Sequence, residues 1–246
     1  MDFKNQVVIV TGGANGIGAS VCESFARKGA KVIISDISES GSTFQNEIQE
    51  KGYHAHFIKT DVKKENDIKS MFDSVMKKYG KIDIVIANAG IADTFSLEEL
   101  SLKQWNNVID INLTGVFLTN KYAIEKMMQQ GNGAIVNTAS MLGTVGKDGV
   151  ISYTSSKGGV VNLTRTLGVT YAREGIRINS VCPGYIKTNI TANKSSNEID
   201  ALEKLHPIQR LGSPHEVAKA IMFLASQEAS FICGSNLIVD GGYTAQ

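Results

Sequence analysis

Residues 7–18 have the sequence VVIVTGGANGIG, and this stretch decides the fold class. Its first four residues are Val or Ile, which is typical of a strand buried on both faces of a parallel sheet. Its glycines are Gly12, Gly13, Gly16 and Gly18. Apolar residues at helical spacing follow them, so the stretch predicts a strand, a tight turn and a helix. This is the first unit of a doubly wound α/β fold.

Short apolar runs alternate with amphipathic segments along the rest of the chain. The predicted strands include residues 32–35, 82–87, 134–137, 176–181 and 237–239, and a further strand precedes Asp61. Residues from Ile68 to Tyr79 and from Val217 to Leu224 have the spacing of helices that cover a sheet. No linker or repeat divides the sequence. We therefore predict an α/β fold with a doubly wound parallel sheet (Rossmann-like) and a single domain over residues 1–246.

The composition narrows the class of partner. The 246 residues are 42% hydrophobic and carry a formal net charge of +1, so we expect neither nucleic acid nor a membrane surface as a partner. The sequence has no signal-peptide pattern and no apolar run that could span a bilayer. Three scattered cysteines and four histidines, including His54 and His56, give no disulfide framework or metal-ligand pattern. We expect a cytoplasmic protein without a metal site that acts on a small molecule.

The glycine-rich turn predicts a nucleotide site. Glycines at the start of a helix let backbone N–H groups approach a pyrophosphate. Asp36 stands eighteen positions after Gly18, at the end of the next strand, where a carboxylate accepts hydrogen bonds from ribose hydroxyls. Asn15 in the turn and Ile37 after the carboxylate provide no cation for a 2′-phosphate. The pattern favours NAD over NADP, and a merely helix-capping Asp36 is the alternative.

Tyr153, Lys157 and Ser140 point to acid–base chemistry. Tyr153 and Lys157 are four residues apart on a helix predicted from Ser152 to about Arg173, so they share one face. A nearby ammonium would lower the pKa of the phenol and make it a usable proton carrier. Ser140 follows a predicted strand, and its hydroxyl can hold a substrate oxygen for proton transfer.

With these motifs, the chain resembles the short-chain dehydrogenase/reductase family along essentially its whole length. The TGxxxGxG turn begins at Thr11, YxxxK runs from Tyr153 to Lys157, and Ser140 stands thirteen positions before the tyrosine. Further matches are Asp61-Val62, Asn88-Ala89-Gly90, Asn112, Pro183-Gly184 and Thr188. The resemblance implies the same Rossmann-like fold and hydride transfer to or from a nicotinamide cofactor.

The resemblance also implies roles for individual residues. Asn112 would join Ser140, Tyr153 and Lys157 as a fourth catalytic residue that holds a water as a proton relay. The implied cofactor-binding residues are Gly12, Asn15, Gly16, Ile17, Gly18, Asp36, Asp61, Val62, Asn88, Gly90, Tyr153, Lys157, Pro183, Ile186 and Thr188. Substrate would contact Ser140, Leu142, Tyr153 and Tyr185, with Val145, Val150 and Ile190 as further apolar wall and residues 189–209 as a lid.

The predicted reaction moves hydride between NAD(H) and the CH–OH or C=O carbon of a small, moderately apolar secondary alcohol or ketone. A steroid, a cyclic alcohol, a sugar and a hydroxyacyl chain all remain open. One alternative is a 3-oxoacyl-(acyl carrier protein) reductase, but Gly131 and Glu174 stand where such relatives have a basic docking pair. A non-catalytic nucleotide-binding protein would be expected to lack Tyr153 or Lys157. A dehydratase or epimerase would be expected to have an altered turn or a longer C-terminal region.

The family resemblance further implies a homotetramer. Helices carrying Asn112 and Tyr153, and the C-terminal helix and strand, would form its interfaces. The candidate contact residues are Phe117, Tyr122, Phe223 and Phe231, and core packing explains these side chains equally well.

Overall fold

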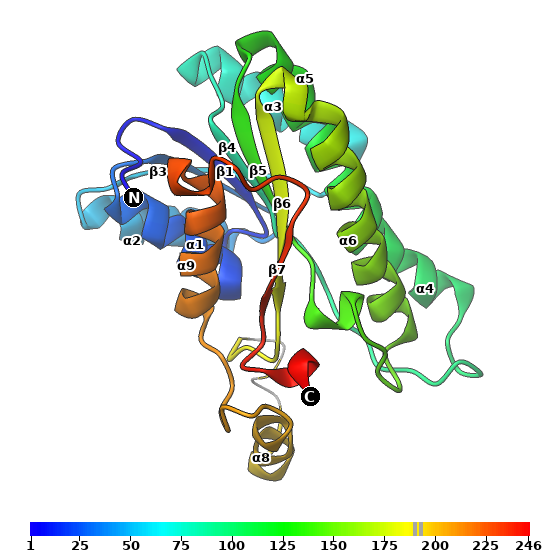
Figure 1. Cartoon of the computed structure of the whole chain (residues 1–246). Helices are drawn as coiled ribbons and strands as arrows, with labels where there is room; N and C mark the ends of the chain where they lie inside the picture. Colours follow the sequence, from blue (N-terminus) through cyan, green and yellow to red (C-terminus); the bar gives the residue numbers. More distant parts are fainter. Residues whose placement is uncertain (189–190, 192–193) are drawn as a thin grey trace.

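One parallel β-sheet forms the centre of the molecule (Figure 1). The computed structural model describes every residue except 189, 190, 192 and 193. Its sheet has seven strands in the order β3-β2-β1-β4-β5-β6-β7, and every neighbouring pair is parallel. The strands are β1 (Val7–Thr11), β2 (Lys31–Asp36), β3 (His54–Lys59), β4 (Ile84–Ala87), β5 (Gly133–Thr138), β6 (Ile176–Pro183) and β7 (Asn236–Val239). The order reverses between β1 and β4, which confirms the doubly wound sheet.

Helices cover both faces of this sheet. α1, α2 and α9 lie on one face, while α3, α5 and α6 lie on the other with α4 beside α6 (Figure 1). The helices are α1 (Gly16–Arg27), α2 (Ser40–Glu50), α3 (Glu65–Tyr79), α4 (Leu102–Ile109), α5 (Gly115–Gln130), α6 (Ile151–Tyr171), α8 (Ser196–Lys204) and α9 (Pro214–Ala225). Among the described helices, none combines the length and the apolar character needed to cross a membrane.

Strand β1 supplies two hydrophobic cores because successive side chains of a strand point to opposite faces. Val8 and Val10 pack with residues of α1 and α9, whereas Val7 and Ile9 pack with residues of α3 and α5. All four side chains are at most 1% exposed. Burial of each such side chain contributes roughly 1.5–3 kcal/mol to folding. The uninterrupted Val/Ile run of β1 therefore reflects helices on both of its faces.

The predicted strand and helix ends differ from the observed ones by one or two residues, as at β4 and α6. The fourth strand begins at Ile84 and not at Ile82, because the Gln130 side chain takes both backbone groups of Ile82: its Oε1 accepts from the amide and its Nε2 donates to the carbonyl, each at 2.9 Å. The helix predicted over 152–173 ends at Tyr171 and tightens into a 3₁₀ turn over Ala172–Glu174. Both differences lie at the edge away from the predicted site.

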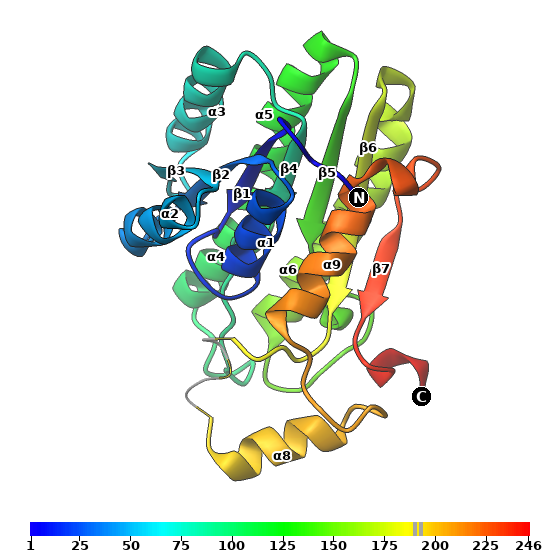
Figure 2. The same cartoon turned by 90° about the vertical axis from the view of Figure 1, so that its left-hand side faces the viewer.

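The motifs meet at the carboxyl edge of the sheet. Because all strands are parallel, the residues that follow β1, β2, β4, β5 and β6 lie along this same edge. The glycine-rich turn, Asp36, Asn88, Ser140 and Gly184 therefore lie along one edge of the sheet, where open α/β sheets bind their ligands. Helix α8 lies beyond the same edge (Figure 2).

Candidate active site

The glycine-rich turn fits closely between its neighbours. Gly12 has φ +63°, and a Cβ there would lie 2.8 Å from the Cα of Ala89 after β4. A Cβ on Gly18 would collide with the Gly12 carbonyl, where α1 starts against the turn. Glycine at these two positions therefore allows the close approach of the turn, the helix and β4.

The first turn of α1 is arranged like an anion site. Its N-cap residue, Asn15, makes no side-chain hydrogen bond to the helix, and the first turn carries no acidic residue. The helices α4, α8 and α9 each begin with a complete capping box, whereas α2, α3, α5 and α6, like α1, have no side-chain cap, so the glycines before α1 are what distinguish its start. Free backbone N–H groups and the positive end of a helix dipole favour a bound anion. The start of α1, with Asn15, Gly16, Ile17 and Gly18, thus fits a pyrophosphate.

Asp36 lies beside this turn. Its Oδ2 accepts a hydrogen bond from the Ala14 amide at 3.0 Å, and its Oδ1 accepts from the Ser38 amide at 2.9 Å. No ion pair joins Asp36 to a Lys or Arg of the described residues within 4.0 Å, and Ile37 is 59% exposed. The carboxylate therefore fastens the turn, and Lys59, its register neighbour on β3, is already ion-paired with Glu39 at 2.6 Å.

Asn88 joins three strands at the centre of the edge. Its Nδ2 donates to the carbonyls of Thr11 and Gly12, each at 3.2 Å, and its Oδ1 accepts from the Thr138 hydroxyl at 3.3 Å. The ends of β1, β4 and β5 are thereby held together. Two further predicted cofactor contacts lie after β3: Asp61 bonds to the Lys63 amide at 3.0 Å, and Val62 is 8% exposed and packs against Gly115.

The structure brings Ser140, Tyr153 and Lys157 together. Ser140 follows β5, and its Oγ accepts from the Leu142 amide at 3.1 Å. Lys157 Nζ lies 5.7 Å from the centroid of the Tyr153 ring and donates to the Thr138 carbonyl at 2.8 Å. Lys157 is only 3% exposed, and this burial lowers its pKa to about 8. A lysine ammonium is thus held under the ring of the tyrosine.

The predicted lowering of the Tyr153 pKa is wrong for this structure. Burial raises the pKa of the phenol, while the nearby Ser140 hydroxyl acts in the opposite direction. Lys157 does not reverse the effect, because it lies below the ring and its ammonium is itself disfavoured by burial. In the structure the phenol is accordingly the protonated, proton-donating form at neutral pH.

Asn112 lies in a π-helical turn, Asp110–Thr114, and not in a regular helix. Its Oδ1 accepts from the Ile91 amide at 2.8 Å, while its Nδ2 donates to the Ile91 carbonyl at 2.8 Å and to Ser156 Oγ at 3.2 Å. A Cβ on Gly90 would lie 3.3 Å from Asn112 Oδ1 and 3.4 Å from Lys157 Nζ. Asn112 and Lys157 therefore converge on Gly90, and π turns are frequent at functional sites.

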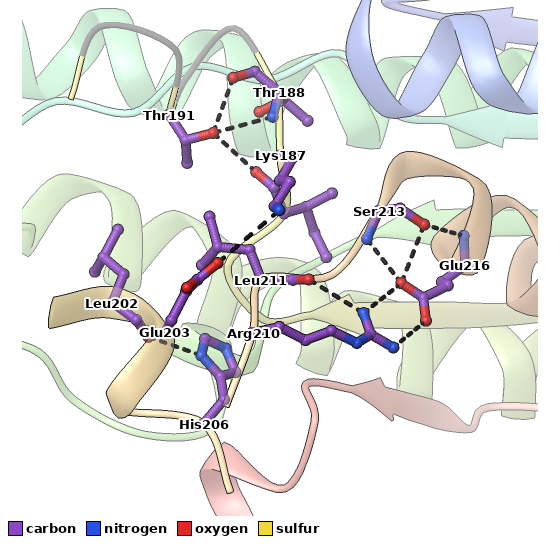
Figure 3. A network of polar contacts seen from close by, with 11 residues as sticks. Lys187, Thr188, Thr191, Leu202, Glu203, His206, Arg210, Leu211, Ser213 and Glu216 are labelled. Carbon is purple, nitrogen blue, oxygen red and sulfur yellow. Dashed lines mark hydrogen bonds and ion pairs between the residues drawn. The ribbon is translucent and has the colours of Figure 1, made fainter. Parts of the chain in front are cut away.

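The loop after β6 reaches back to the glycine-rich turn. Thr188 lies where a Cβ on Gly16 would contact its methyl group at 3.4 Å. Thr188 donates its amide to Thr191 Oγ1 at 3.0 Å, and Ile186 is 7% exposed (Figure 3). Pro183 ends β6 just before this loop. The predicted cofactor-binding residues Ile186 and Thr188 are thus on a loop that approaches the predicted pyrophosphate site at Gly16.

Tyr185 faces a cluster that the sequence did not reveal. Its ring lies 5.6 Å from that of His206 and 6.2 Å from that of Tyr243, and its amide donates to His206 Nε2 at 3.3 Å. His206 Nδ1 bonds to the Leu202 carbonyl at 2.9 Å, so it connects this loop to the end of α8 (Figure 3). These contacts join segments distant in sequence, and no local pattern signals them.

One contact fixes the segment between α8 and α9, and another joins α8 to the loop after β6 (Figure 3). Arg210 binds the Glu216 carboxylate through both terminal nitrogens, at 2.9 and 2.6 Å, and Glu216 also completes the cap of α9 with Ser213. Lys187 Nζ lies 3.9 Å from Glu203 Oε1. A cavity of about 320 Å³ lies between this segment, the loop after β6 and the end of β7, and Tyr185 lines it.

The other predicted residues have mixed positions. Leu142 is 6% exposed and Val145 is 37% exposed, while Ile190 lies outside the described residues, as do three more of the 189–209 lid. Of the predicted interface residues, Phe117 and Phe231 are exposed. Tyr122 packs in the core and bonds to Glu65, and Phe223 also packs against the core. Gly131 and Glu174 lie before β5 and β6, at the edge opposite the site.

Known proteins resemble this chain over nearly its whole length. A family model described as Enoyl-(Acyl carrier protein) reductase matches residues 12–244. A cis-4-hydroxycyclohexanecarboxylate dehydrogenase of Sinomonas cyclohexanicum is 44% identical over 99% of this chain and 98% of its own length. A cyclohexanol dehydrogenase of Acinetobacter sp. (strain SE19) is 41% identical over 99% and 97%.

Solved structures agree with the sequence relatives. The crystal structure of a short-chain type dehydrogenase/reductase from Mycobacterium marinum has a TM-score of 0.95 at 35% identity and covers 100% of this chain and 98% of its own. The matched region includes the glycine-rich turn, Ser140, Tyr153 and Lys157. This chain belongs to the short-chain dehydrogenase/reductase family.

Proposed function

We propose that this oxidoreductase interconverts a cyclic secondary alcohol and its ketone with NAD(H). The observation that carries the proposal is the grouping of Ser140, Tyr153 and Lys157 at the sheet edge that also holds the glycine-rich turn. The dehydrogenases of this family generally use nicotinamide cofactors. The relatives that oxidise cyclohexanol and hydroxycyclohexanecarboxylate support a ring-bearing alcohol as substrate.

The choice of NAD over NADP rests on Asp36. Its carboxylate lies at the end of β2 beside the uncapped start of α1, where the adenosine ribose would be held. A fixed negative charge repels a 2′-phosphate, and neither Asn15 nor Ile37 offers a compensating cation. The residues that would hold the cofactor are those of the turn, Asp61 with Val62, Asn88 with Gly90, and the loop from Pro183 to Thr188.

In the proposed reaction Tyr153 carries the proton. The bound nicotinamide would accept or supply the hydride at the carbinol carbon. During alcohol oxidation the Tyr153 phenolate takes the hydroxyl proton, and during ketone reduction the phenol returns it. The Ser140 hydroxyl holds the substrate oxygen and favours the phenolate, and the Lys157 ammonium would bind the nicotinamide ribose. Asn112 would hold the water through which Lys157 exchanges protons with solvent.

The substrate pocket would be walled by Leu142, Val145, Val150 and Tyr185, with residues 189–209 as its lid. Mostly apolar walls around one catalytic hydroxyl and phenol suit a small ring that carries one reacting oxygen. We also propose a cytoplasmic homotetramer, in which the exposed Phe117 and Phe231 contact other subunits.

A carrier-protein-bound acyl chain is the second candidate, because the matching family model is described as an enoyl-(acyl carrier protein) reductase. An acidic carrier protein would need cations near the site entrance. Gly131 and Glu174 lie at the opposite edge of the sheet in this chain, so they do not bear on the entrance. The similar proteins named for cyclic alcohols favour a free substrate instead. A free small molecule therefore remains the preferred substrate.

An absorbance assay at about 340 nm tests the proposal directly. With NAD⁺ and a panel of cyclohexanol, cyclopentanol, a steroid alcohol and a sugar alcohol, we expect NADH formation with the cyclic alcohols at the highest kcat/KM. NADP⁺ should be a poor substitute. Reduction of an acyl-carrier substrate with a higher kcat/KM than that of cyclohexanone would overturn the proposed substrate class.

The pH dependence follows from the raised pKa of Tyr153. Oxidation needs the deprotonated phenol, so its kcat/KM should keep rising with pH to above about pH 10, while ketone reduction, which needs the phenol, should stay level up to about that pH. Ser140→Ala removes the hydroxyl that lowers this pKa, so the residual oxidation should need a higher pH. The measurement is the pH profile of both directions for the two proteins. A profile that Ser140→Ala does not move, or moves to lower pH, would contradict the assignment.

A further inference from the structure

Lys147 lies on the loop between β5 and α6, which also carries Ser140. Its Nζ lies 5.6 Å from the centroid of the Tyr185 ring, on the loop after the neighbouring strand β6. The side chain is partly buried although the loop around it is mostly exposed. Two loops at the carboxyl edge of the sheet thus place a cation against a ring of the predicted substrate pocket.

This ammonium has no acidic partner in the part of the chain that the structure describes. Ion pairs within 4.0 Å join other lysines to carboxylates, including Lys187 to Glu203, but none includes Lys147. Asp148 follows it in sequence and is exposed. Asp93, on the segment that faces this loop, accepts from the Ser152 hydroxyl through Oδ1 at 2.5 Å, and its buried Oδ2 has no partner among the described residues, so it does not pair with Lys147. The positive charge of Lys147 is therefore available to a ligand.

The Tyr185 hydroxyl adds a second unsatisfied donor. It is buried and has no hydrogen-bond partner among the described residues. Burial raises the pKa of Tyr185 to about 12, so the group is a neutral hydroxyl that donates. Lys147 and Ser140 lie on the same loop after β5, and Tyr185 lies on the loop after the neighbouring strand β6. The lysine and the unpaired hydroxyl therefore lie together at the sheet edge that carries Ser140.

We propose that Lys147, with the Tyr185 hydroxyl, binds a carboxylate on the substrate, so that the preferred substrates are cyclic secondary alcohols with a ring carboxylate. A lysine ammonium suits this task because it attracts a carboxylate without demanding one fixed orientation. The positive charge of Lys147 favours binding of a substrate that carries a carboxylate over one that is neutral. A hydrogen bond from the Tyr185 hydroxyl then orients that carboxylate. The inference rests on the proposed function, since the acid is a substituent of the alcohol that Tyr153 deprotonates.

Kinetics with paired substrates provide the first test. Lys147→Met removes the charge and keeps a long side chain, and Lys69→Met makes the same change at an exposed lysine on α3. With NAD⁺, Lys147→Met should raise KM for 4-hydroxycyclohexanecarboxylate by about tenfold and change KM for cyclohexanol by less than about twofold. Lys69→Met should change neither. Equal effects on both alcohols, or no effect on the acid, would overturn the inference.

A binding measurement decides the inference even without turnover. Cyclohexanecarboxylate has no carbinol, so it reports only the acid site, and cyclohexanecarboxamide is its neutral counterpart. In titration calorimetry, the wild type should bind cyclohexanecarboxylate more tightly than cyclohexanecarboxamide. Added salt should weaken the binding of the carboxylate and leave that of the amide unchanged. Lys147→Met should remove both differences, and their persistence would refute the role of Lys147.

The outcomes also separate the two proposals. Oxidation of cyclohexanol without any preference for the acid would reject the carboxylate site and leave the proposed function standing. Absence of turnover with every alcohol, together with charge-dependent binding of the acid, would reject the proposed function and support the anion site.

Discussion

Replacing Tyr153 by Phe is expected to reduce kcat for alcohol oxidation by about 10²- to 10⁴-fold, the usual contribution of a positioned proton carrier. The substitution removes only the hydroxyl. The ring stays over Lys157 Nζ, which remains held by the Thr138 carbonyl. NADH binding, measured by fluorescence, and the thermal midpoint of unfolding should therefore stay close to those of the wild type.

A matched control is available on the same helix. Tyr171 ends α6, far from the carboxyl edge of the sheet, and Tyr171→Phe should leave kcat unchanged. The comparison separates loss of the acid–base hydroxyl from a general effect of removing a tyrosine hydroxyl from α6. If Tyr153→Phe kept more than about a tenth of wild-type kcat, the proposed acid–base role would fail.

The second large effect is expected at Asp36. Asp36→Asn removes the charge but keeps one side-chain oxygen that can accept from the Ala14 or the Ser38 amide. Asp36→Ala removes the charge and both accepting oxygens. Both variants should lower the ratio of kcat/KM for NAD⁺ to that for NADP⁺ by about 10- to 100-fold, because the repulsion of a 2′-phosphate is gone. Asp36→Ala should in addition raise KM for NAD⁺ and lower the thermal midpoint, since the turn loses two hydrogen bonds.

The pair of variants separates two roles of one carboxylate. Steady-state kinetics with each cofactor give the preference, and thermal denaturation gives the contribution to the turn. An unchanged cofactor ratio in both variants would show that Asp36 only fastens the turn through Ala14 and Ser38. A changed ratio in Asp36→Asn with unchanged stability would identify the charge as the determinant.

Features fixed by local sequence were predictable. The strand β1, the turn after it and the shared face of Tyr153 and Lys157 follow from short-range periodicity and spacing. The start of β4 was not predictable from Ile82 alone, because Gln130 competes for its backbone groups from another element. The π turn at Asn112 and the contacts of His206 with Tyr185 likewise depend on segments that meet only in the folded chain.

The pKa values of the site residues were harder to predict from the sequence than their positions in the fold. The sequence places a lysine one helical turn from Tyr153, which argues for a lowered phenol pKa. In the structure burial acts on both groups at once, so the pKa of Tyr153 rises and that of Lys157 falls to about 8. The effect of burial depends on how much of the surrounding fold excludes water, and no spacing rule contains that information.

The uncapped start of α1 couples nucleotide affinity to folding. A capping side chain stabilises a helix by about 1 kcal/mol, and α1 lacks the capping interaction that α4, α8 and α9 have. The first turn of α1 therefore lacks this stabilisation in the free protein, and an anion that binds to its N–H groups supplies it. By thermodynamic linkage, whatever occupies the turn also resists unfolding of the whole domain. A side chain at position 15 that did form the cap hydrogen bond would therefore stabilise the free protein and compete with the cofactor for the same N–H groups.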